Sequence, residues 1–166
     1  SVILATTITI LKTSLKSKIF NFILAFYISF IRGTPILVQI FLVYYVLPVF
    51  GLNLGPFTAG ILAITLNSAA FVTEILRGGL ASVPIPQTFI TSIPPLVNEF
   101  TMVLKATALL SLITVVELMR VSQQIYGANY HPVEVLSGTF VIYFLMCFVV
   151  SRSSAFLEKK FKVKRA

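Results

Sequence analysis

Three of the five acidic residues in this 166-residue chain, Glu74, Glu99 and Glu117, lie inside or beside long apolar runs. A charge at membrane depth is costly, so it needs an opposite charge or a water-lined cavity. Binding of a cation is therefore the chemistry that these carboxylates favour. The cation is either a basic side chain of the protein or a solute.

Glu99 is the carboxylate that best fits a solute site. It follows Pro94 and Pro95 near the start of an apolar run, and Met102 comes three residues later on an adjoining helical face. The polarizable thioether of Met102 can pack against an aliphatic stem. The alternative is a carboxylate at the membrane boundary, bonded to a neighbouring helix or to Lys105 of another subunit. Lys105 of the same helix lies about 120° around the axis, an awkward angle for a pair.

The other two carboxylates have basic residues close by in the sequence. Asn67, Ala70 and Glu74 share one small, polar helical stripe, which is typical of a solute pathway. Glu74 also precedes Arg77 by one turn, so an ion pair between them is the alternative. Glu117 precedes Arg120 by one turn, and we interpret these two as an ion pair on the outer surface.

The sequence offers little for catalysis or metal binding. Cys147 stands alone in an apolar run, 16 positions from the single histidine, His131, and no nucleophile motif surrounds it. A catalytic zinc needs about three converging protein ligands, and the chain contains no aspartate. No phosphate-binding loop of the Gly-x4-Gly-Lys-Ser/Thr type occurs. We therefore predict a chain that is not an enzyme and has no metal or cofactor of its own.

The composition is that of a membrane protein. Hydrophobic residues make up 57% of the chain and charged residues 11%, against about 25% charged in soluble proteins. The mean hydropathy is +0.98, and residues 33–73 carry no charge. This nearly excludes a soluble globular enzyme. The net charge of +8 comes from clusters beside apolar runs, which are typical of anchors at a cytoplasmic membrane face rather than of nucleic-acid binding.

The pattern predicts one all-α, polytopic membrane domain over residues 1–166, with about five transmembrane helices. We expect a break near Gly33 and Pro35, because proline removes a backbone donor. The run at 2–11 is too short to span a bilayer, so we expect the first half of its helix to be missing. A short helix plus loop is expected at 117–132, on the outer side. The predicted apolar runs cover residues 2–11, 19–49 with its break at 32–35, 57–76, 94–116 and 133–150.

The basic residues predict the orientation. Lys12, Lys16, Lys18, Arg77 and the tail from Arg152 fall on one side if five spans alternate, and the turn at 51–56 has no charge. Basic residues favour the cytoplasmic side of a membrane. We therefore expect the N-terminus outside and the C-terminus in the cytoplasm.

Several motifs, taken in order, resemble the transmembrane permease subunit of bacterial ABC importers for polar amino acids, the histidine/arginine/glutamine type. The resemblance covers nearly the whole chain. Its strongest parts are Arg-Gly-Thr-Pro at 32–35, Leu-Asn-Ser-Ala-Ala at 66–70, Arg-Gly-Gly at 77–79, Asn-Glu-Phe at 98–100 and Glu-Leu-x-Arg at 117–120.

This resemblance implies the type I ABC importer permease fold and alternating access between two permease subunits, identical or different. It also implies two cytoplasmic ATPase subunits, which bind ATP and Mg²⁺, and an extracytoplasmic amino-acid-binding protein. In arginine-type relatives the amino acid is held by residues that correspond to Asn67, Glu99 and Met102. Glu99 favours a cationic amino acid, namely arginine, lysine or histidine. A neutral polar amino acid such as glutamine stays the alternative, because its α-ammonium could also meet Glu99; an intramembrane enzyme or a passive channel has less support.

The chain departs from the family pattern at two places. Where relatives read Leu-Lys-Asp-Thr-Ser-Leu, residues 104–109 lack the acid that usually follows Lys105. Relatives also carry a cytoplasmic loop of the Glu-Ala-Ala-x-x-x-Gly type, whose helix docks on the ATPase. That loop is absent between Pro84 and Ile85, and we expect about 20 to 25 residues to be omitted there.

Overall fold

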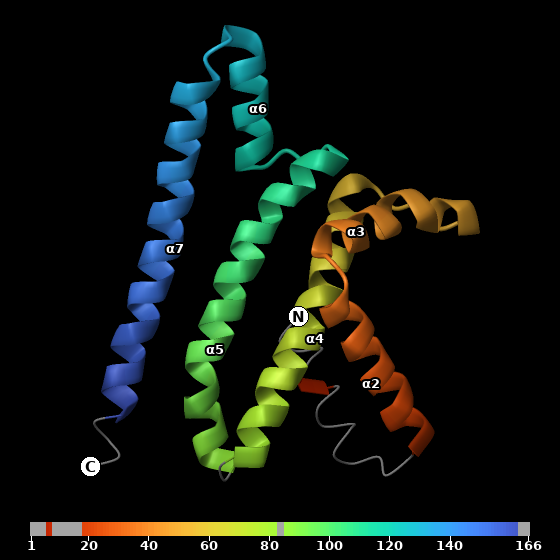
Figure 1. Ribbon diagram of the computed structural model, residues 1–166, viewed down its shortest axis with the longest axis vertical. Helices are drawn as coiled ribbons and strands as arrows, with labels where there is room; N and C mark the ends of the chain where they lie inside the picture. The colour runs from red at the N-terminus through yellow and green to blue at the C-terminus, as the bar shows by residue number, and fades with distance from the viewer. Residues whose placement is uncertain (1–5, 8–17, 83–84, 163–166) are drawn as a thin grey trace.

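The computed structural model describes residues 6–7, 18–82 and 85–162, and helices account for nearly all of them (Figure 1). No strand occurs within these ranges, so the predicted all-α class is confirmed. The helices in chain order are α2 (Lys18–Gly33), α3 (Ile36–Phe41), η1 (Leu42–Val46), η2 (Leu47–Phe50), α4 (Pro56–Ser82), α5 (Ile85–Ala106), η3 (Thr107–Ile113), α6 (Leu118–Asn129) and α7 (Pro132–Lys162).

Three segments in the described part of the chain are long and apolar enough to cross a membrane: Pro56–Leu80, Thr91–Ile113 and Pro132–Ser153. A fourth candidate is the pair Lys18–Gly33 and Ile36–Phe50, which bends by 110° between its halves. The predicted break at 32–35 is therefore confirmed. Pro35 lies in an extended conformation (φ −64°, ψ 135°) and interrupts the helix. The predicted first helix at 2–11 lies outside the described residues, apart from Thr6 and Thr7.

Two predicted helix boundaries differ from the structure. Helix α4 continues past the Arg-Gly-Gly motif to Ser82. Helix α5 begins at Ile85, so Pro94 and Pro95 lie inside it rather than at its start. Prolines are tolerated within membrane helices because neighbouring groups can satisfy the carbonyls that they free. The α-helical geometry ends at Ala106 and continues as the 3-10 helix η3, which Thr114 closes in a left-handed conformation (φ 67°).

The predicted ion pair between the side chains of Glu117 and Arg120 is wrong. Glu117 is the N-cap of α6, and its carboxylate accepts hydrogen bonds from the backbone N–H groups of Met119 and Arg120, both at 2.7 Å. Tyr143 of α7 also donates its hydroxyl to this carboxylate at 3.0 Å. The free N–H groups of a first helical turn compete for such a carboxylate. The expected short helix at 117–132 is present as α6.

Helix α4 lies at the centre of the bundle and packs against α2, α3, η3 and α5, while α7 packs against α5 and α6 (Figure 1). Ile40, Ala63 and Ile113 form the best-buried core, where α3, α4 and η3 meet. A second cluster joins α2 to α4 through Ile28 and Ala70. Tyr27 ties the same two helices together, because its hydroxyl donates to the Leu66 carbonyl at 2.6 Å.

The outer face of α7 is apolar and aromatic. Phe140, Phe144 and Phe148 are exposed and stack along the helix, with ring centroids 6.5 and 5.8 Å apart. Cys147 is partly buried on the same helix. These exposed rings, spaced one helical turn apart, agree with the interpretation of the aromatic residues as lipid-facing or packing groups.

Gly60 of α4 faces the side chain of Leu110 on η3. A methyl group at this position would lie 2.8 Å from Cδ2 of Leu110, whose side chain is buried. We expect Gly60→Ala to lower the free energy of unfolding by about 1–2 kcal/mol, in the range of overpacked cores. The matched control is Gly138→Ala in α7, where a methyl group meets nothing within 4 Å. That change is expected to stabilise the helix by up to about 1 kcal/mol. Thermal unfolding of the detergent-solubilised variants would contradict the packing argument if both changes had the same sign.

Candidate solute-binding cavity

A cavity of about 330 Å³ lies between the broken helix, α4 and α5. Its walls come from three places in the sequence that are far apart. The lining residues are Thr34 and Ile36 at the break, Asn67 and Phe71 on α4, and Asn98, Glu99, Met102, Val103 and Ala106 on α5. The structure therefore brings Asn67, Glu99 and Met102, the three residues singled out in the sequence, to one cavity.

Asn67 forms part of the α4 wall and is 9% exposed. Its Nδ2 donates a hydrogen bond of 2.9 Å to Oε1 of Gln39 on α3. The carbonyl oxygen Oδ1 has no hydrogen-bond partner within residues 18–82 and 85–162. This oxygen is not fully buried, so it remains a free hydrogen-bond acceptor.

Glu99 is partly buried on the α5 wall, close to Ser68 of α4. None of the ion pairs formed by described residues involves Glu99. Lys105 is exposed and does not line the cavity, so it does not neutralise Glu99 within the chain. Met102, one turn further along α5, is 58% exposed at the edge of the cavity.

Sequence reasoning missed Gln39 of α3, which is 5% exposed and accepts the hydrogen bond from Asn67 of α4. Its amide nitrogen Nε2 donates to the carbonyls of Ile31 and Thr34, at 2.9 and 3.1 Å, and to Oγ1 of Thr34 at 2.9 Å. Gln39 stands in an otherwise apolar run just after the Pro35 break. A buried amide at membrane depth needs partners, and that signal could have singled it out.

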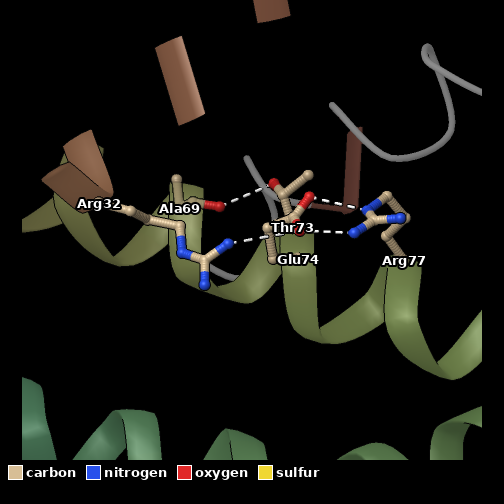
Figure 2. Close-up of polar contacts among 5 residues, drawn as sticks. All are labelled: Arg32, Ala69, Thr73, Glu74 and Arg77. Carbon is tan, nitrogen blue, oxygen red and sulfur yellow. Dashed lines mark hydrogen bonds and ion pairs between the residues drawn. The ribbon is translucent and has the colours of Figure 1, made fainter. Parts of the chain in front are cut away.

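Glu74 is held by two arginines (Figure 2). It does not line the cavity. Arg77 binds it with two hydrogen bonds of 2.8 Å, from Nε and Nη2, so for Glu74 the structure favours the alternative of an ion pair with Arg77. Arg32 of α2 approaches the same carboxylate from the other side, with Nη1 at 3.5 Å. Its guanidinium also lies over the ring of Phe71, 5.7 Å from the centroid. The stripe that contains Asn67 and Glu74 thus divides into a cavity wall and an ion cluster.

A partly open cavity that combines apolar and polar lining residues and lies among apolar helices fits a membrane transport protein. No family model matches the sequence. The chain is 34% identical to the L-cystine transport system permease protein TcyB of Bacillus subtilis, over 92% of this chain and 75% of that protein. It is 31% identical to the glutamine transport system permease protein GlnP of Escherichia coli, over 86% and 76%, and 37% identical to the nopaline transport system permease protein NocM of Agrobacterium fabrum, over 82% and 70%.

The crystal structure of an amino acid ABC transporter with histidines matches the fold with a TM-score of 0.90 and 32% identity. The match covers 96% of this chain and 84% of that chain. The chain belongs to the family of amino acid ABC transporter permeases. It is a multi-pass membrane subunit of a transporter complex and not itself an enzyme, because ATP hydrolysis belongs to a separate subunit.

Proposed function

We propose that this permease binds a cationic amino acid, namely arginine, lysine or histidine, in the cavity between the broken helix, α4 and α5. The observation that carries the proposal is the Glu99 carboxylate, which lines a cavity at membrane depth and has no basic partner in the described part of the chain. An unpaired charge there is expensive, and a cationic solute offsets that cost. The cavity volume falls in the range of small-molecule sites.

Each of the three residues has a role in this proposal. Glu99 balances the positive charge of the solute. Asn67 offers Oδ1 as a hydrogen-bond acceptor, because its Nδ2 is already engaged with Gln39. Met102 packs its thioether against the aliphatic part of the solute. The alternative is a neutral polar amino acid such as glutamine, with Glu99 bound to its α-ammonium. Relatives named for cystine, glutamine and nopaline leave both substrate classes open.

The assembly proposed for this function contains two permease subunits, two cytoplasmic ATPase subunits that bind ATP and Mg²⁺, and an extracytoplasmic amino-acid-binding protein. We also propose that the N-terminus is outside and the C-terminus in the cytoplasm. Helix α2 begins at Lys18, and the C-terminal end of α7, which follows Arg152 in the sequence, lies at the same end of the bundle as this start (Figure 1). Basic residues gathered at one end support a cytoplasmic location for that end.

Uptake into proteoliposomes that contain the reconstituted complex tests the substrate class. With labelled L-arginine outside and ATP inside, we expect ATP-dependent accumulation that unlabelled L-lysine or L-histidine reduces and L-glutamine at the same concentration does not. Competition by L-glutamine alone would favour the neutral alternative. Accumulation of none of these amino acids would refute the proposed function.

A further inference from the structure

The orientation of the Gln39 amide is fixed by the chemistry of its neighbours. Nε2 lies 2.9 Å from the carbonyl oxygen of Ile31 and 3.1 Å from that of Thr34. A carbonyl oxygen can only accept a hydrogen bond. The nitrogen must therefore face these two groups, and a flipped amide would place oxygen against oxygen. Oε1 of Gln39 is consequently directed toward Asn67.

The Gln39 amide in turn fixes that of Asn67. Because Oε1 of Gln39 is an acceptor, only the Nδ2 end of Asn67 can bind it, and the two atoms lie 2.9 Å apart. Both side chains are buried, so a mispaired amide would bear the cost of an unsatisfied polar group. Oδ1 of Asn67 is thereby turned away from Gln39. The carbonyls of Ile31 and Thr34 at the helix break thus orient the Gln39 amide, which in turn orients the Asn67 amide at the cavity.

We propose that Gln39 is a positioning residue that makes the Asn67 end of the cavity a hydrogen-bond acceptor, and that this favours an ammonium or guanidinium group over a carboxylate there. The inference rests on the proposed function. With Asn67 held in this way, the wall presents Oδ1 from α4 and the Glu99 carboxylate from α5, and both accept hydrogen bonds. A carboxylate group of a solute would meet two acceptors and no donor from this pair.

The same amide also joins the cavity to the broken helix. The Thr34 hydroxyl donates to the Phe30 carbonyl at 2.9 Å and accepts a bond of 2.9 Å from Gln39. Carbonyls at the end of a helix have no partner in the next turn, and here Thr34 and Gln39 bind those of Phe30 and Ile31. The conformation of the break and the direction of the Asn67 amide are therefore set by one side chain.

Equilibrium dialysis of labelled L-arginine against the purified, detergent-solubilised complex of permease and ATPase subunits, without the amino-acid-binding protein, tests this role. We expect Gln39→Leu to weaken binding about tenfold, since the loss of one oriented hydrogen bond to a charged group is of this order. Gln39→Met, which keeps the length of the side chain, should act in the same way. The matched control is Tyr27→Phe, which removes the hydrogen bond between α2 and the Leu66 carbonyl without touching the Asn67 amide. It is expected to change binding less than about twofold.

A double-mutant cycle separates orientation from general loosening of the fold. Asn67→Asp places an acceptor at both ends of the side chain, so its direction no longer matters. In the presence of Gln39, one Asp oxygen faces Oε1 and is repelled. The gain in L-arginine affinity from Asn67→Asp should therefore be about tenfold larger in the Gln39→Leu background than with Gln39 present.

The outcomes distinguish this inference from the proposed function. If the wild-type complex binds L-arginine but Gln39→Leu behaves like Tyr27→Phe, or if Asn67→Asp changes affinity by the same factor in both backgrounds, the positioning role is refuted and the proposed function stands. If the wild-type complex binds none of L-arginine, L-lysine and L-histidine, the proposed function itself fails. Thermal unfolding of each variant verifies that the complex remains assembled at the temperature of the measurement.

Discussion

Glu99→Gln is expected to lower the affinity of the transporter complex for L-arginine by about ten- to hundredfold. The change keeps the size of the side chain and removes its charge. Hydrogen bonds to charged groups are worth about 1.5–3 kcal/mol, which corresponds to this range of affinity. The side chain lines the cavity and has no basic partner among the described residues, so the loss falls on the solute rather than on an internal ion pair.

L-citrulline makes this measurement decisive between the two substrate classes. It has nearly the shape of L-arginine but carries a neutral urea group in place of the guanidinium. If Glu99 binds the side-chain cation, Glu99→Gln weakens L-arginine and leaves L-citrulline unchanged. If Glu99 binds the α-ammonium, both ligands weaken by the same factor. The control variant is Glu134→Gln, an exposed carboxylate at the start of α7, which should leave both affinities as they are; unchanged binding of both ligands to Glu99→Gln would remove Glu99 from the site.

Ala106→Phe is expected to reduce binding of every amino acid, cationic or neutral, by about a hundredfold or more. Ala106 lines the cavity where α5 ends, and a benzyl group there occupies the space of the solute. Overpacking alone costs about 1–3 kcal/mol, and the lost contacts between solute and wall add to it. Equilibrium dialysis with labelled L-arginine and L-glutamine measures the effect.

An exposed alanine gives the control for this occlusion. Ala128 lies on the surface of α6, so Ala128→Phe should leave binding to the detergent-solubilised complex unchanged. Full binding by Ala106→Phe would mean that the solute occupies another part of the molecule. Together with Glu99→Gln, the variant separates a loss of charge, which discriminates between ligands, from a loss of volume, which does not.

The helix break and the convergence of three cavity residues could both be predicted from the sequence. A glycine and a proline two positions apart, with apolar residues on either side, leave few alternatives to a bend. Asn67, Glu99 and Met102 stand out partly by helical spacing and partly by resemblance to a family, and all three line one cavity. Their contact with a substrate stays a prediction.

What the sequence did not reveal depended on contacts between distant residues. Gln39 binds Asn67 across 28 positions, and no local pattern indicates which buried amide meets which. The spacing rule that suggested a Glu117–Arg120 side-chain pair took no account of the competing N–H groups at the start of α6. Pro94 and Pro95 suggest a helix start because proline is common there, whereas α5 accommodates both inside the helix.

Lys105 has a consequence for what surrounds α5. This side chain is exposed although it lies well within the candidate span Thr91–Ile113. Placing a lysine in contact with lipid hydrocarbon near the middle of the membrane would cost about 2.5–3.5 kcal/mol. We therefore expect the face of α5 that bears Lys105 to contact another polypeptide or a water-filled interface. Lipid acyl chains are expected instead on the face of α7 that bears the phenylalanines.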